Sequence, residues 1–253
     1  MYSFCIVDRL KQDKGYLMKA LKAYQMQYQI LFRNSEPIPA KEIANSVKNF
    51  GRSYDRMVRR IIKDSTILNE DTFKNNAFNL LRSFKMVRSD RFVDIRINMG
   101  KIEDSKGKLK DCWEAAKEEL HFVRTLLNNQ KIEPRTRTLL LLDEETKKRI
   151  FPHLWSAFNK LLTITMGKHS YGLLGASKIL FSAFPEIVLP VDNPEWLSVF
   201  KSVDLGDVIN LMAEEIKKWE EETGEYLDHC DSKFELTLPA IYNVMAMEAR
   251  PLT

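Results

Sequence analysis

The chain has 253 residues, 44% hydrophobic and 29% charged, which is enough to bury the core of one large domain or two ordinary ones. Its apolar runs are too short for a membrane span and its start does not resemble a secretory signal, so we expect a cytoplasmic protein that does not contact a membrane. The net charge of +4 is uneven: residues 1–100 hold 19 Lys and Arg against 10 Asp and Glu, and residues 101–253 hold 20 against 25, so the basic half favours a polyanionic partner.

The first predicted elements are helices. Leucines and tyrosines recur at 4-3-4 spacing between residues 16 and 33, as on one face of an amphipathic helix. Pro39 then opens a short helix that ends at "KNFG", where Gly51 permits the positive φ common at a helix end.

A strongly basic helix is predicted next, at residues 52–64. Its sequence is "RSYDRMVRRIIKD", and five cations fall at offsets 0, 4, 7, 8 and 11, which is a single helix face: Arg52, Arg56, Arg59, Arg60 and Lys63. Like charges at this spacing repel, and only Asp55 and Asp64 soften the repulsion. Phosphate suits guanidinium groups as a counter-charge, so we expect this face to contact nucleic acid.

Residues 71–83 form a further predicted helix with a polar outer face. The side chains expected to point outward are Lys74, Asn75, Asn76, Asn79 and Arg82. An asparagine amide can donate to and accept from adenine together, so Asn75 and Asn79 are candidate base readers. A polar surface without such a role is the alternative interpretation.

After this helix the apolar side chains recur at every second residue. This spacing predicts a β-hairpin at residues 84–98 with Arg88 and Arg91 at its tip. Helices followed by "LLRSFKMVRSDRFVDIRIN" resemble a winged helix-turn-helix domain over roughly residues 15–98. The resemblance implies DNA binding through a recognition helix beside a wing. Charge favours residues 52–64 for that helix, and adjacency to the wing favours residues 71–83.

The polar stretch 98–108 contains two glycines and is a candidate domain boundary. We therefore expect a mainly α protein with a winged-helix-like basic domain at 1–99 and an all-α domain at 100–253. Apolar side chains keep a heptad-like spacing through 109–127, at Leu109, Trp113, Ala116, Leu120, Val123 and Leu127. This helix is either an ordinary core helix or the seam of a homodimer.

Beyond residue 142, Asp143 is expected to cap a helix that Pro152 breaks or kinks. Further helices are predicted at about 173–184, 194–201, 204–223 and 237–247. Acidic residues of the 204–223 helix interleave with Lys217 and Lys218, as on a solvated surface.

Residues 171–196 are similar to the hairpin of helix-hairpin-helix DNA glycosylases. The similarity rests on "YGLLGASKILF" and "PVDNPEW", in which Gly175, Lys178 and Asp192 match a hairpin glycine, a lysine and an aspartate of that family. The resemblance implies that Lys178 forms a Schiff base and that Asp192 is essential. An exposed lysine and a capping aspartate are the alternative interpretation.

The sequence predicts no metal site and no cofactor. Cys5, Cys112 and Cys230 lie far apart, and no nucleotide-binding loop or metalloprotease motif is present. We therefore expect a DNA-binding protein in a regulatory or genome-maintenance role, with RNA as an alternative ligand. The other two alternatives are a glycosylase-like enzyme and a protein-interaction module with a basic face.

Overall fold

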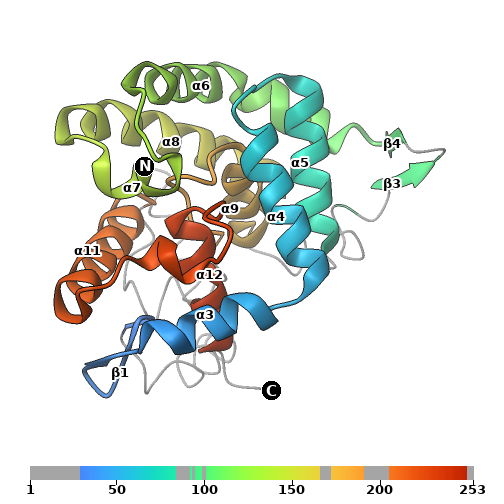
Figure 1. Cartoon of the computed structure of the whole chain (residues 1–253). Coiled ribbons are helices and arrows are strands. Elements are labelled where there is room, and N and C mark those ends of the chain that lie inside the picture. The colour runs from blue at the N-terminus through green and yellow to red at the C-terminus, as the bar shows by residue number, and fades with distance from the viewer. Residues whose placement is uncertain are drawn as a thin grey trace, which may run out of the picture.

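The structure is a computed structural model, and it describes residues 29–83, 92, 95–98, 101–165, 172–190 and 205–249. Within these ranges the protein is mainly α-helical, with two small antiparallel two-stranded sheets (Figure 1). No helix among these residues is long and apolar enough to cross a membrane. The elements in chain order are β1 (Phe32–Arg33), β2 (Glu36–Pro37), α3 (Ala40–Asn49), α4 (Arg52–Asp64), α5 (Glu70–Ser83), β3 (Ile95–Asn98), β4 (Lys101–Asp104), α6 (Lys108–Gln130), η2 (Arg135–Arg137), α7 (Thr138–Leu141), α8 (Glu144–Thr165), α9 (Leu173–Ala183), α11 (Leu205–Thr223), η3 (Leu227–Cys230) and α12 (Leu238–Glu248).

The helix predicted at 16–33 does not extend to its expected end. Residues 1–28 lie outside the described part, and residues 29–33 are not helical, because Phe32 pairs with Pro37 in a small hairpin. Asn34 and Ser35 form its turn with φ of 53° and 69°. Two successive positive φ values are what a tight hairpin turn requires, and asparagine tolerates them better than most residues.

Helices α4 and α5 begin where the sequence indicated. Gly51 precedes α4 with a φ of 116°, a conformation that L side chains rarely adopt. The first turn of α5 is closed reciprocally: the Thr72 backbone N–H donates to Asn69 Oδ1 at 2.9 Å, and the Asn69 N–H donates to Thr72 Oγ1 at 3.0 Å. Such a capping box satisfies two backbone donors that the helix itself leaves open.

The second hairpin lies later in the chain than predicted. Strand β3 falls inside the expected 84–98 hairpin, but it pairs with β4, in the stretch interpreted as a boundary. Ile97 faces Ile102 across the pair, which adds an apolar cross-strand contact to the register. Residues 84–91, including the predicted tip, lie outside the described part of the chain. The Asp104 carboxylate accepts from the backbone N–H of Lys108 and Leu109 and so opens α6.

In the second half, the helix expected near Pro152 is not broken, because α8 runs through this proline. The heptad-like face of α6 is buried in the protein's own core and packs mainly on α8. A homodimer through α6 stays a prediction, and it would need the other face of the helix. The helix predicted at 194–201 lies outside the described residues.

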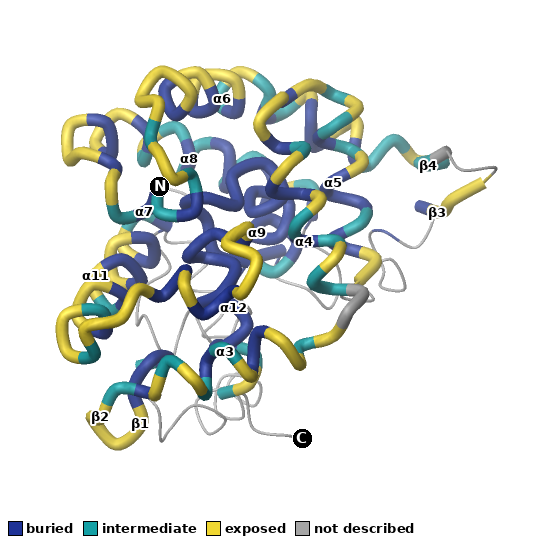
Figure 2. The backbone as a smooth tube through the Cα atoms, viewed as in Figure 1, coloured by how far each residue is buried: buried dark blue, intermediate teal, exposed yellow. Residues whose placement is uncertain are grey.

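Helices from the two predicted domains share one buried cluster of apolar side chains. Helix α5 packs on α9, and α3 packs on α12 and η3. Figure 2 shows buried chain continuing from α4 and α5 through α9 to α12. The division at residue 99 stays a prediction, but an isolated 1–99 fragment would expose apolar side chains that the whole chain buries.

Candidate functional site

Three cations of α4 point to solvent in one row. Arg56, Arg60 and Lys63 are exposed and stand at i, i+4 and i+7, which is one face of the helix. The Arg60 side chain is 68% exposed and its Nε donates to Asp64 at 3.2 Å. Arg56 and Lys63 form no ion pair with any residue that the structure describes. We call Arg56, Arg60 and Lys63 the α4 cation row. The side chain of Arg52 lies outside the part of the chain that the structure describes.

Arg59, the fourth cation of the predicted face, turns into the protein. Its Nε donates to Asp55 at 2.8 Å, and its two terminal nitrogens each donate to Asp231 at 2.7 Å. The side chain is only 13% exposed. Burial alone would lower the pKa of the guanidinium, but hydrogen bonds to Asp231 and Asp55 outweigh it and raise that pKa. Arg59 therefore connects α4 to the C-terminal part of the chain and offers little surface to a ligand.

Asp231 also organises the turn that follows it. Besides Arg59, its carboxylate accepts hydrogen bonds from the backbone N–H of Lys233, Glu235 and Leu236. Burial opposes ionisation of this carboxyl group, but the hydrogen bonds from Arg59 and the backbone lower its pKa to about 2. A single carboxylate thus fixes the 231–236 turn against α4.

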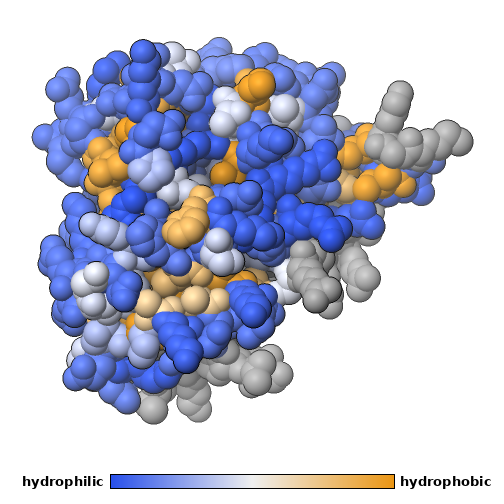
Figure 3. Space-filling view, viewed as in Figure 1, coloured by the Kyte–Doolittle hydropathy of each residue, from blue (hydrophilic) through white to orange (hydrophobic). Residues whose placement is uncertain are grey.

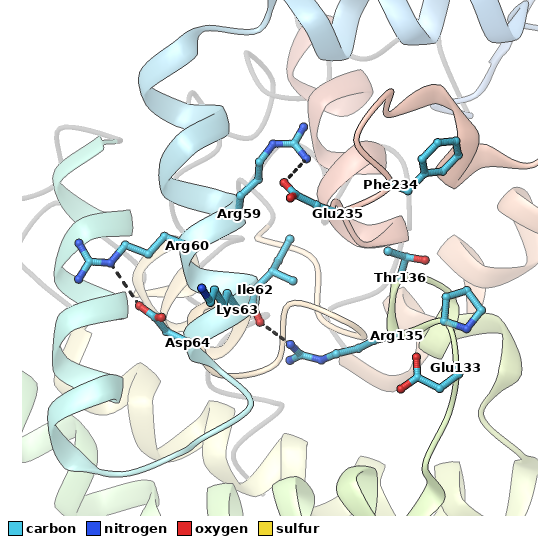
Figure 4. A pocket seen from close by; sticks show the side chains of 11 residues that line it. Arg59, Arg60, Ile62, Lys63, Asp64, Glu133, Arg135, Thr136, Phe234 and Glu235 are labelled. Atoms are coloured by element: carbon cyan, nitrogen blue, oxygen red, sulfur yellow. Dashed lines mark hydrogen bonds and ion pairs between the residues drawn. The ribbon is translucent and has the colours of Figure 1, made fainter.

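A pocket of about 720 Å³ lies between the C-terminal half of α4 and two loops of the second half (Figure 4). Arg60 and Lys63 line it on the α4 side, and the residues at 133–136 and 234–235 line it opposite. The Arg135 side chain reaches from its loop to α4, where it donates to the Ile62 carbonyl and, at 2.9 Å, to Ser65 Oγ. It thereby satisfies one of the carbonyls that the end of α4 leaves open.

Other arginines of the second half are paired with carboxylates. Glu186 accepts from Arg124 and from Arg135. Burial works against ionisation of Glu186, yet the charges of the two arginines lower its pKa. Arg137 contacts Glu220 at 2.7 Å and Asp228 at 2.6 Å. Glu220, one of the acidic residues of the 204–223 helix, was expected on a solvated surface. Its side chain is instead only 12% exposed, because it pairs with Arg137.

The predicted polar face of α5 is only partly exposed. Asn75 and Arg82 are exposed, whereas Asn79 is half-buried. Asn76 is buried, so its expected outward orientation is wrong. Lys74 pairs with Glu70 one turn earlier. Arg88 and Arg91 lie outside the described residues.

Lys178, the candidate nucleophile, is fully buried on α9 at 1% exposure, so the interpretation as an exposed lysine is wrong. Gly175 lies in the same helix and packs closely on α8: a Cβ there would lie 2.9 Å from the Thr165 Cβ. Asp192 lies outside the described part of the chain.

Three exposed rings that no sequence pattern predicted lie beside the pocket: Tyr226, His229 and Phe234. The His229 ring meets Tyr226 edge-on at 5.2 Å and Phe234 edge-on at 5.3 Å. Their spacing follows neither a helix nor a strand period, so no periodic signal marks them. Only the two aromatic residues flanking "LDHCDSK" hint at them.

Among the described residues, no group of three or more His, Cys, Asp and Glu side chains could hold a metal ion. Cys112 and Cys230 are buried free thiols, and burial raises the pKa of each to about 12. Comparison with protein-family models, with curated proteins and with solved structures finds no match. What the chain does is therefore inferred from its own side chains.

Proposed function

We propose that this protein binds DNA through the α4 cation row, in a regulatory or genome-maintenance role in the cytoplasm. The observation that supports this most is the exposure of Arg56, Arg60 and Lys63 on one helix face, with Asp64 as the neighbouring carboxylate. Phosphates spaced along a strand can neutralise such a row, and the resulting release of counterions favours binding.

Within this proposal α5 and the β3–β4 hairpin take the places of a recognition helix and a wing. The hairpin follows α5 in the chain and projects from the helical body (Figure 1). Arg96 and Asn98 are exposed on it, and Asn75 is exposed on α5. Helix α3, which precedes α4 in the chain, packs mainly on α12 and η3. A winged-helix-like role is therefore supported best for α4, α5 and the hairpin.

The test measures duplex affinity of the full chain by fluorescence anisotropy at low salt. The Arg56→Ala/Lys63→Ala double variant should bind every duplex sequence more weakly, by a similar factor, because phosphate contacts carry no base information. The matched control is Lys148→Ala/Arg149→Ala, which removes two exposed cations from α8. If both double variants lost duplex affinity equally, binding would depend on the net charge of the protein. That result would refute a site on α4.

A second candidate function is an enzyme acting on DNA through Lys178 and Asp192. Its support is the complete burial of Lys178 on α9, which shields the amine from bulk water, as enclosed active sites do for a reacting group. Borohydride reduction in the presence of a duplex with an abasic site would trap the covalent adduct. An adduct that is absent in Lys178→Met establishes this function, and the lack of any adduct with the wild-type chain rejects it.

A further inference from the structure

The three exposed rings form one continuous surface, which we call the aromatic row: Tyr226, His229 and Phe234. Tyr226 is 54% exposed and Phe234 is 59% exposed, and His229 contacts both rings. Single exposed apolar side chains are common on protein surfaces, but three rings of which the middle one contacts both others make a patch. Figure 3 shows one face of the molecule, which is mostly hydrophilic with separate hydrophobic patches.

Phe234 is held in a conformation that its own backbone disfavours. Its φ is 53°, in the left-handed region, where a residue with a Cβ is strained by about 1–2 kcal/mol. The Asp231 carboxylate maintains the turn through its hydrogen bonds to Lys233, Glu235 and Leu236. Strain that surrounding contacts maintain at an exposed aromatic side chain is typical of binding sites.

Tyr226 is fixed at the other end of the row. The Arg137 guanidinium lies over its ring, 4.8 Å from the centroid. Arg137 is itself held by Glu220 and Asp228, so it cannot move away without breaking two ion pairs. A ring fixed in this way loses little conformational freedom when a ligand stacks on the row.

The aromatic row lies across a single pocket from the α4 cation row, because Phe234 lines this pocket on the side opposite Arg60 and Lys63 (Figure 4). Glu133 and Glu235 line the pocket opposite α4 and would repel phosphate, so the α4 side is where a phosphate backbone fits. Rings for base stacking beside cations for phosphates are the combination used by proteins that bind single strands. In a duplex the bases are stacked on each other, and their faces are not accessible to such rings.

We infer that the aromatic row stacks on unpaired bases of a single-stranded nucleic acid whose phosphates lie along the α4 cation row. This inference rests on the proposed function and narrows its ligand from DNA in general to strands with accessible bases. The sugar is left open, because stacking on a base face does not distinguish RNA from DNA.

The experiment compares the full chain on a labelled single-stranded oligonucleotide and on a duplex of the same sequence. Phe234→Ala should weaken single-strand binding by about 5- to 150-fold, the range for loss of one stacked base, and should leave duplex affinity within about twofold. Phe234→Trp should restore single-strand binding. Phe122→Ala is the matched control, because Phe122 is an exposed aromatic on α6 that stacks on His153. Phe234→Gly guards against misfolding, since glycine suits the positive φ.

The outcomes separate this inference from the proposed function. Suppose that the wild-type chain binds duplex and that Phe234→Ala either leaves both affinities unchanged or lowers the affinities for single strand and duplex by the same factor. The inference is then wrong, and DNA binding by α4 stands. If the wild-type chain binds neither ligand, both are wrong. Binding of an acidic peptide that Phe234→Ala abolishes, without any binding of single strands, would assign the row to a protein partner and overturn the inference.

Discussion

At the scale of single residues, Arg59 and Arg60 are neighbours on α4 with opposite environments. Arg60 is exposed, whereas Arg59 donates to Asp55, Asp231 and Glu235. Helical spacing placed both on one basic face, and it could not separate them, because the partner Asp231 is 172 residues away in the chain. A long-range ion pair leaves no periodic signal in a sequence.

The Arg59–Asp231 pair predicts a specific acid sensitivity. The folded-state pKa of Asp231 is about 2, below the value of 3.8 for an unperturbed side chain, so its contribution to stability is complete above pH 3.8 and is lost as the pH falls through 2. The free energy of unfolding should therefore fall by at most about 2 kcal/mol more in the wild type than in Asp231→Asn between pH 5 and pH 2. Urea unfolding at both pH values measures this difference. An equal fall in the wild type and in Asp231→Asn would contradict this prediction.

Phe234 gives a second prediction at this scale. Phe234→Gly should be about 1 kcal/mol more stable than Phe234→Ala, because both variants lack the ring and only glycine adopts a φ of 53° without strain. Chemical denaturation of the two variants measures the difference. An alanine variant as stable as the glycine variant would mean that this turn is not strained.

At the scale of elements, the packing of α8 against α9 depends on Gly175. Alanine in an uncrowded helix stabilises it by about 1 kcal/mol relative to glycine. At position 175, however, a Cβ would lie 2.9 Å from Thr165 Cβ and 3.2 Å from its Cγ2, and overpacking of this kind typically costs about 1–3 kcal/mol. Gly175→Ala should therefore lower the thermal midpoint. A higher midpoint would show that α8 and α9 can separate slightly without loss of stability.

Most helices could be predicted from the sequence, whereas the pairing of the short strands could not. Helices α3, α4, α5, α11 and α12 were predicted to within a residue or two, because apolar side chains recur at 3.6-residue spacing and Gly51 marks a clear break. The β1–β2 hairpin was missed because its strands have only two residues each, too few for a period of two. The β3–β4 pairing was missed because the polar stretch 98–108, with its two glycines, was interpreted as a domain boundary and not as a turn and a strand.

At the scale of the whole molecule, the proposed site depends on packing that no local pattern reveals. The pocket forms only because α4 meets the 133–136 and 231–236 loops, and Arg59 and Arg135 hold those contacts. Asp231, Arg135 and Phe234 therefore gain their roles from tertiary structure. The basic character of α4 was readable from sequence, whereas the division of its cations into structural and exposed ones was not.

The central claim is that the exposed cations of α4 contact phosphates, and the salt dependence of binding tests it most directly. Each phosphate contact contributes a slope of about −0.9 to log K against log salt on duplex DNA. We predict that Arg56→Ala/Lys63→Ala binds with a slope shallower than that of the wild type by about 2, whereas Lys148→Ala/Arg149→Ala keeps the wild-type slope. A slope unchanged by loss of Arg56 and Lys63, in a chain that still binds duplex, would contradict the account.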